Sequence, residues 1–327
     1  MASGPSAHSA TTPPRHFLYV GRDRDLVHSA AMLDTPALEG AQVKYTWREL
    51  EPERGRYDLH RVQDDIAYLT SHGKRLVVQL QDASFDDRVN TPDYLARDTT
   101  FHGGSAHKYT SESADDSLGR FTGWIARRWD PAVQARWAAL LEVLGDSLDG
   151  RIEALVLSET ATEFGASGRY RPAGFTPESY VRGIQAQIAA ARSAFHRTSV
   201  IQYANFMPGE WLPKTDHGYL RAVIAFAESA GAGIGGPDLM PTRKELRAHA
   251  YPLIAARPAG VVAGLAVQNG NLATLDPVTH QPLGIARVAA FAQDSLRLDY
   301  VFWGTQEPWF TRDVLPWLRA QPARAPH

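Results

Sequence analysis

The sequence contains no cysteine, and this absence excludes several kinds of site. Disulfides, zinc–thiolate centres and thiol nucleophiles are all ruled out, because each of them requires the cysteine sulfur. The absence leaves the cellular compartment open, since proteins of oxidising compartments also exist without disulfides. Cysteine content therefore restricts the chemistry of the protein and not its location.

Long apolar runs are also missing. No segment approaches the ~18 consecutive apolar residues that mark a membrane helix, so we expect no membrane partner. Residues 1–15 are small, polar and proline-containing, which predicts a flexible leader without the apolar stretch of a signal peptide. We expect a periplasmic or secreted protein whose signal is not part of this sequence, with a cytoplasmic protein as the alternative.

Neither sign of charge dominates, because 34 basic residues stand against 36 acidic ones and the formal net charge is -2. This balance gives no electrostatic reason to expect nucleic acid as a partner, and it favours a neutral or weakly polar substrate. The 12 histidines show no HxH or HExxH spacing, and no GxSxG motif is present. We therefore expect neither a metal nor a cofactor, and the oligomeric state stays open.

What the sequence does contain, from residue 16 onward, is an alternation of short β-like runs with longer amphipathic runs. This alternation predicts a parallel sheet flanked by helices, and 44% hydrophobic residues can fill its core. The predicted strands are His16–Gly21, Gln42–Trp47, Arg75–Leu80, Ile152–Ser158, Ser199–Ala204, Gly233–Gly236, Val261–Val267 and Tyr300–Trp303. The predicted helices include Leu59–His72, Pro131–Leu148, Thr176–Phe195, Tyr219–Ala230, Arg243–Ala256 and Pro282–Leu296.

Eight such strands predict an α/β fold, a single (β/α)8 TIM barrel over residues 16–327 that carries the catalytic site. An open, doubly wound sheet is the alternative, but no glycine-rich phosphate loop follows the first strand. The sixth strand is the weakest element, because glycine inside a strand is typical of a bulge or of close backbone approach. A long loop after strand three, Gln81–Asp130, would open on the catalytic face, so we expect it to wall the substrate; a plain surface loop is the alternative.

The carboxyl ends of the predicted strands carry mainly amides, aromatic rings and carboxylates. Amides and carboxylates hydrogen-bond hydroxyl groups, and Trp or Tyr faces cover the C–H faces of sugar rings, so a carbohydrate substrate is expected. For the aromatic candidates core packing is the alternative, and for Asp82 a loop cap is. The predicted substrate-binding residues are Trp47, Asp82, Tyr203, Asn205, Gln268, Asn269 and Trp303.

Glu159 is the sharpest catalytic candidate, because it directly follows a buried strand. Partial burial there would raise its pKa towards that of a general acid, whereas a cap or salt bridge is the structural alternative. Glycoside hydrolysis usually needs a second carboxyl, ~5 Å away for retention and ~6.5–9.5 Å for inversion. Asp238, which follows glycine and proline, and Glu307, which lies between tryptophans, are the candidates. A turn cap for Asp238 and a loop carboxylate outside the pocket for Glu307 are the alternatives.

Lys44, on the second predicted strand, is a candidate for covalent catalysis. A lysine can form a Schiff base with a carbonyl substrate. So early in its strand, however, an ion pair is the better interpretation, and aldolase-like chemistry is set aside.

Residues 44–59, KYTWRELEPERGRYDL, resemble the second-strand signature of clan A glycoside hydrolases, W-x-x-L-E-P-x-x-G-x-Y-D. Residues 72–80, HGKRLVVQL, are similar to the third strand of those families. Leu157-Ser158-Glu159 is similar to the segment that carries their acid/base glutamate on strand four, and Phe302-Trp303 to their aromatic strand eight. The resemblance implies a (β/α)8-barrel glycoside hydrolase in which Glu159 is the acid/base.

Two departures from the clan pattern bear on mechanism. Ser158 stands where the clan has an asparagine, and Gln268 stands where it has its nucleophilic glutamate. Three explanations follow: an inverting enzyme with Asp238 or Glu307 as base, a retaining enzyme with a relocated nucleophile, or a non-catalytic glycan-binding barrel. We favour inversion, because a relocated base needs only room for a water. The prediction is a glycoside hydrolase acting on a polysaccharide or oligosaccharide.

Overall fold

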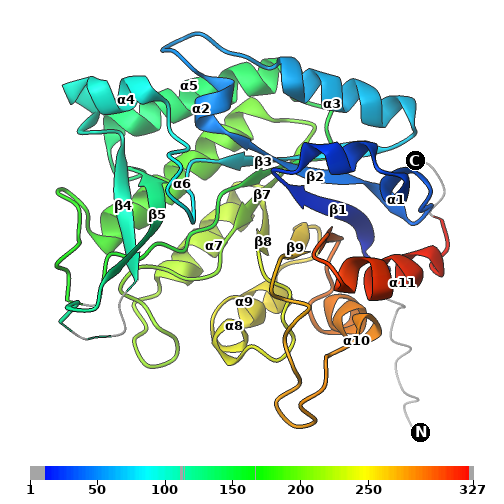
Figure 1. Cartoon of the computed structure of the whole chain (residues 1–327). Helices are drawn as coiled ribbons and strands as arrows, with labels where there is room; N and C mark the ends of the chain where they lie inside the picture. The colour runs from blue at the N-terminus through cyan, green and yellow to red at the C-terminus, as the bar shows by residue number, and fades with distance from the viewer. Residues whose placement is uncertain (1–11, 111–112, 114, 166, 324–327) are drawn as a thin grey trace, which may run out of the picture.

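A computed structural model describes residues 12–323 apart from 111, 112, 114 and 166. Eight parallel strands close into a barrel in the order β1-β2-β3-β6-β7-β8-β9-β10, and β10 pairs back onto β1. The predicted (β/α)8 barrel is therefore confirmed (Figure 1). The barrel strands are β1 (Arg15–Gly21), β2 (Leu38–Thr46), β3 (Arg75–Gln81), β6 (Ala154–Leu157), β7 (Ser199–Tyr203), β8 (Gly233–Gly236), β9 (Ala263–Val267) and β10 (Tyr300–Gly304).

Helices surround the barrel, and the two longest begin at well-formed caps. Asp130 accepts hydrogen bonds from two backbone N–H groups of its helix, Thr176 forms a capping box, and proline is the first residue of each helix. The helices are α1 (Ala30–Leu33), α2 (Trp47–Leu50), α3 (His60–Ser71), α4 (Asp93–Arg97), α5 (Pro131–Leu148), α6 (Pro177–Ala194), α7 (Tyr219–Ser229), α8 (Lys244–Ala248), α9 (Ala250–Ala256), α10 (Ile285–Ala290) and α11 (Leu315–Arg319). Single turns add 3-10 segments at Arg24–His28 and Thr99–Phe101 and π segments at Phe291–Ser295 and Phe310–Val314.

Two predicted helices have different forms in the structure. The predicted helix Arg243–Ala256 is divided into α8 and α9 at His249, whose φ of -102° and ψ of -91° are not helical. The predicted helix Pro282–Leu296 starts later, at Ile285, and ends in a π turn. Among the described residues, no helix combines the length and apolar character needed to cross a bilayer.

The strands alternate between two hydrophobic cores, because successive side chains of a strand point to opposite faces. One core fills the barrel interior and includes Val77, Val156 and Phe302. The larger core lies between the barrel and its helices and includes Val78 and Leu157. The face to which a strand residue belongs therefore decides whether its side chain reaches the barrel interior at all.

The glycine-rich strand β8 is confirmed, and packing explains its composition. A Cβ on Gly235 would lie 2.1 Å from the carbonyl oxygen of Gly264 on β9 and 3.1 Å from the ring of Tyr203 on β7. Only glycine allows the neighbouring backbone and this ring to approach so closely.

The amino-terminal end of the barrel is closed by a polar network around Arg15. Its guanidinium pairs with Glu39 at 2.6 Å and forms a second ion pair with Glu153, whose Oε1 also accepts a hydrogen bond of 2.6 Å from the Tyr300 hydroxyl. These groups come from β1, β2, β10 and the residue before β6. Polar groups at this end of a TIM barrel serve stability, which leaves the carboxyl ends of the strands for function.

The long segment after β3 has structure of its own. It contains α4 and an antiparallel hairpin of β4 (Ser105–Thr110) and β5 (Arg120–Ala126), which stands to one side of the barrel in Figure 1. Lys108 and Ile125 lie on the buried face of this hairpin, while His107 and Phe121 are exposed. The hairpin thus packs one face inward and presents the other to solvent. Of the expected leader, residues 1–11 lie outside the described residues, and β1 begins at Arg15.

Candidate active site

Glu159 is the second residue after β6 and is partly exposed at the carboxyl end of the barrel. Its Oε2 accepts a hydrogen bond of 2.6 Å from Asn205 Nδ2. Burial raises the pKa of Glu159 above its ordinary value and the negative charge of Asp238 adds to this, although the Asn205 hydrogen bond and the positive charges of Lys108 and Lys44 oppose it. A carboxyl that keeps its proton to higher pH can act as a general acid.

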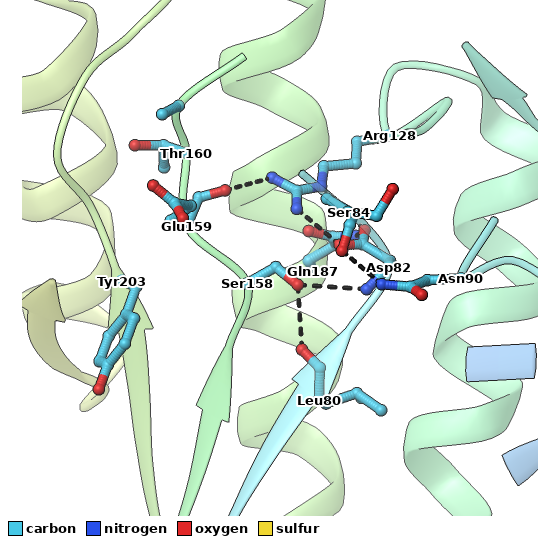
Figure 2. A network of polar contacts seen from close by, with 12 residues as sticks. Leu80, Asp82, Ser84, Asn90, Arg128, Ser158, Glu159, Thr160, Gln187 and Tyr203 are labelled. Carbon is cyan, nitrogen blue, oxygen red and sulfur yellow. Dashed lines mark hydrogen bonds and ion pairs between the residues drawn. The ribbon is translucent and has the colours of Figure 1, made fainter. Parts of the chain in front are cut away.

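A buried ion pair fixes the backbone of Glu159 from one side. Arg128 donates to both carboxylate oxygens of Asp82, at 2.8 and 2.6 Å, and neither side chain is exposed. The same guanidinium donates to the carbonyl oxygen of Glu159 at 2.8 Å (Figure 2). Gln187 donates a further hydrogen bond of 3.1 Å to Asp82. Burial alone would raise the pKa of Asp82, but Arg128 outweighs it and holds that pKa below its ordinary value.

The prediction that Asp82 binds substrate is therefore wrong. Its carboxylate is 1% exposed, and its oxygens already accept hydrogen bonds from the guanidinium and the amide. Because Arg128 joins it to the backbone of Glu159, Asp82 acts as a positioning residue.

The β7 strand end fixes Glu159 from the other side. Asn205 Oδ1 accepts hydrogen bonds from the backbone N–H groups of Ala161 and Phe206, at 3.1 and 2.9 Å, while its Nδ2 donates to Glu159. Thr160 Oγ1 donates to the carbonyl oxygen of Phe206 at 2.9 Å. These bonds engage both ends of the Asn205 amide, so its side chain orients the Glu159 carboxyl in place of the predicted direct contact with a sugar.

Asp238 lies just beyond β8, with 12% of its side chain exposed. Its Oδ1 accepts hydrogen bonds from Gln268 Nε2 at 2.9 Å and Asn271 Nδ2 at 2.8 Å, and Arg243 Nη1 is 4.0 Å from Oδ2. Its negative charge contributes to the raised pKa of Glu159, so the structure brings these two predicted carboxylates into one electrostatic environment. Gln268 contacts Asp238 directly, whereas Asn269, also predicted to bind substrate, is exposed in the next loop.

Glu307, the other candidate for the second carboxyl, lies on the surface and not among the neighbouring tryptophans. Its carboxylate is exposed and accepts hydrogen bonds from the backbone N–H of Thr311 at 3.3 Å and from the Thr311 hydroxyl at 2.5 Å. These bonds satisfy the start of the π turn that follows, which makes Glu307 a capping residue. Within the described part of the chain, no cluster of three His, Asp or Glu side chains is arranged to hold a metal ion.

The three aromatic residues predicted as stacking platforms are all fully buried, so these predictions are wrong. Trp47 donates to Glu51 at 2.8 Å and packs edge-to-face on Trp137, with ring centroids 5.0 Å apart. Trp303 donates to His16 at 3.2 Å. Tyr203 (Figure 2) points into the barrel interior. Its hydroxyl hydrogen-bonds Gln42.

Exposed aromatic rings do occur near the strand ends, but on loops. Trp211, in the loop after β7, is 49% exposed and stacks on Phe206 with ring centroids 5.5 Å apart and planes at 10°. The ring of His249 packs edge-on against both, and its Nε2 accepts a hydrogen bond of 2.8 Å from the backbone N–H of Leu212. A ring fixed on one face and open on the other suits sugar stacking. Because Trp211 lies on a loop, the periodicity of the strands gives no sign of its exposed position.

Two lysines near Glu159 were not among the predicted site residues. Lys108 on β4 is 1% exposed, and its Nζ donates to the carbonyl oxygen of Ser84 at 3.3 Å and lies 3.3 Å from the centroid of the Phe85 ring. Burial lowers the pKa of Lys108 to about 8, against the opposing charges of Glu159 and Glu163. Its place on a buried hairpin face follows only from the pairing of β4 with β5.

Lys44 lies on β2, and its Nζ is 5.2 Å from the centroid of the Tyr19 ring. The ion pair expected for it does not form with any described carboxylate. Its positive charge instead contributes to the electrostatic environment of Glu159.

No protein-family model and no curated protein sequence matches this chain. Several solved structures share its fold. The catalytic domain of β-amylase from Paenibacillus polymyxa has a TM-score of 0.60 at 9% identity, over 95% of this chain and 100% of that one. GH5_18 from Streptomyces cattleya in complex with GlcNAc has a TM-score of 0.55 at 16% identity, over 90% and 71%.

A β-galactosidase from Halorubrum lacusprofundi has a TM-score of 0.54 at 13% identity, over 88% of this chain and 52% of that one. At such identities the likeness shows the fold alone. The chain has a (β/α)8 barrel, the fold of these three solved structures.

Proposed function

We propose that this protein is a glycoside hydrolase that cleaves a polysaccharide or oligosaccharide, with Glu159 as the general acid. One observation carries the proposal: the carboxyl of Glu159 is fixed on both sides at a barrel strand end, and its pKa is raised by burial and by Asp238. The glycosidase names of proteins with the same fold support it. An acid/base glutamate after strand four is also what the sequence resemblance implies.

Asp238 is the proposed base of an inverting reaction. Its Oδ1 is held by two amide donors, while its Oδ2 has Arg243 at 4.0 Å and is available to a water. In this reaction the proton of Glu159 passes to the leaving oxygen as the glycosidic C–O bond breaks. The water oxygen bonds to the anomeric carbon from the opposite face, and its proton passes to Asp238. Gln268, at the position of the clan nucleophile, orients that base.

The test is a screen of the purified protein on bacterial and plant polysaccharides, with reducing-end detection and NMR of the product anomers. We expect Glu159→Gln and Asp238→Asn to lose at least about 100-fold in rate. The capping variant Glu307→Gln should keep full activity, and the first product should have the inverted anomeric configuration.

Full activity of Glu159→Gln on a glycan that the wild-type protein cleaves would overturn the proposal. Glycan binding without cleavage by the wild-type protein would instead support the non-catalytic alternative. Retained anomeric configuration would keep Glu159 as the acid but reject Asp238 as a base that activates water.

A further inference from the structure

Two positively charged side chains near Glu159, those of Lys44 and Lys108, form no ion pair with a described carboxylate. As a general acid, Glu159 must be protonated and therefore neutral. The remaining carboxylate of the proposed pair, Asp238, faces Arg243 at 4.0 Å. This leaves Lys44 and Lys108, both of which act electrostatically on Glu159, without a carboxylate partner of their own. Charged groups removed from bulk water are normally paired, so this arrangement points to an anion that the substrate supplies.

Lys44 is the lysine that a substrate can reach. On β2, Val43 and Tyr45 belong to the outer core, so Lys44 points to the inner side, as Gln42 does. It is partly exposed, in contrast to Lys108. Within the described chain, its ammonium group makes no hydrogen bond or ion pair, and its one close contact is the face of the Tyr19 ring. Three N–H donors are therefore free for a ligand.

The strand register places Lys44 below Glu159 on the inner side of the barrel. Lys44 pairs with Gln79 on β3, and Gln79 pairs with Val156 on β6, three residues before Glu159. The ammonium group of Lys44 lies beside the Tyr19 ring, and its charge acts on Glu159.

Gln79 supplies an independent sign of a ligand. It is 3% exposed, and its Oε1 is buried with no hydrogen-bond partner in the described chain. A buried acceptor without a partner is costly unless a ligand or a water satisfies it. The register thus makes Lys44, with its unpaired ammonium group, and Gln79, with its unsatisfied amide oxygen, neighbouring residues on β2 and β3.

We propose that the sugar bound beside Glu159 is a uronic acid, whose carboxylate pairs with Lys44 while one of its hydroxyls donates to Gln79. This inference rests on the proposed function and specifies its substrate class. It replaces the neutral substrate expected from the net charge of -2, because a whole-chain sum does not report the charge in one pocket. Lys108 is buried, so it adds positive potential to the site without contacting the sugar.

The alternative is that Lys44 serves only to adjust the protonation of Glu159. In that case replacing Lys44 would shift the pH profile of any glycan cleavage, but it would not change the preference between acidic and neutral sugars. Ligand preference therefore separates the two roles.

The test compares binding of glucuronic, galacturonic and mannuronic acids with binding of glucose, galactose and mannose, by ligand-observed NMR at low and high salt. We expect at least one acid to bind roughly tenfold or more tightly than its neutral parent. Lys44→Met should abolish that preference and Lys44→Arg should keep it, with added salt weakening it. Lys214→Met, which removes an exposed lysine from the loop after β7, is the matched control and should keep the preference.

Equal binding of acids and neutral sugars, no binding of any acid, or a preference that survives in Lys44→Met would each overturn the inference. Cleavage of neutral polysaccharides alone, lost in Glu159→Gln, would overturn it while the proposed function stands. Lysine-dependent uronate binding without cleavage of any glycan would support it and count against the proposed function.

Discussion

The guanidinium of Arg128 forms a bidentate ion pair with Asp82, and the two residues are separated by 46 positions in the sequence. Both side chains are fully buried, and the same guanidinium donates to the carbonyl oxygen of Glu159. The ion pair that stabilises the fold thus also fixes the backbone position of Glu159, the proposed acid. Stability and activity are therefore coupled at this pair.

Replacing one member of this pair should be strongly destabilising. Arg128→Met leaves the Asp82 carboxylate buried without its cationic partner, so we expect a loss of about 3–5 kcal/mol in the free energy of unfolding. Arg312→Met, which removes an exposed pair with Asp313, should cost less than about 1 kcal/mol. Urea unfolding followed by circular dichroism measures both. A double variant Arg128→Met/Asp82→Leu should recover part of the loss, and a cost for Arg128→Met as small as that of the control would contradict this account.

The positive charge of Lys108 should set the alkaline limit of activity. The general acid must be protonated, so kcat/KM falls as pH rises through the pKa of Glu159. Lys108 lowers that pKa, and its removal in Lys108→Met should therefore raise the pKa and move the alkaline limb to higher pH. The pH profile of kcat/KM on a cleaved glycan measures this, with Lys214→Met as a control that leaves the limb in place. A limb that stays still or moves to lower pH would count against Glu159 as the acid.

Among the aromatic residues, the exposed ring of Trp211 should contribute to substrate binding and the buried ring of Trp303 to stability. Trp211→Ala removes an exposed ring, so we expect KM to rise by up to roughly tenfold with little change in stability. Trp303→Ala removes a fully buried ring, so we expect a loss of about 3–5 kcal/mol of stability. Substrate titration and urea unfolding of both variants test the division. If Trp211→Ala left KM unchanged, its stack on Phe206 would be a feature of the loop alone.

The strand count was predictable because each barrel strand is a short buried run between amphipathic helices. Strand β8 was also predicted, although its glycines made it the weakest element. The structure explains these glycines, because the close approach of Gly264 and Tyr203 requires them. The position of Glu159 was predictable for a related reason, because a residue that follows a buried strand of a barrel lies at the carboxyl end of that strand.

The face on which each side chain lies was not predictable where the strand ends. Trp47 is already the first residue of α2, so strand alternation no longer decides its direction. Tyr203 does point inward, but it is fully buried and its hydroxyl is bonded to Gln42. The burial of Asp82 depends on Arg128, and that of Lys108 on the pairing of β4 with β5. Such long-range contacts leave no local pattern in the sequence.

Asp149 takes no part in the proposed site, but its carboxylate should make the stability of the fold depend on pH. Its carboxylate, 11% exposed, accepts hydrogen bonds from the backbone N–H groups of His196, Arg197 and Thr198, at 3.2, 3.0 and 2.8 Å. Burial opposes ionisation, but these bonds outweigh it and lower the pKa of Asp149 to about 2. The pKa of an unfolded aspartate is about 3.9, so the folded state gains stability above that pH and loses it as pH falls towards 2.

Asp149→Asn should therefore be less stable than the wild-type protein at pH 7 but should lose less stability between about pH 4 and 2. Thermal unfolding at a series of pH values measures both effects. Asp34→Asn, which alters an exposed aspartate after α1, is the control and should follow the wild-type curve at every pH. A constant gap between Asp149→Asn and wild-type protein from pH 7 to pH 2 would show that Asp149 stabilises the loop before β7 by geometry alone, with no contribution from its ionisation.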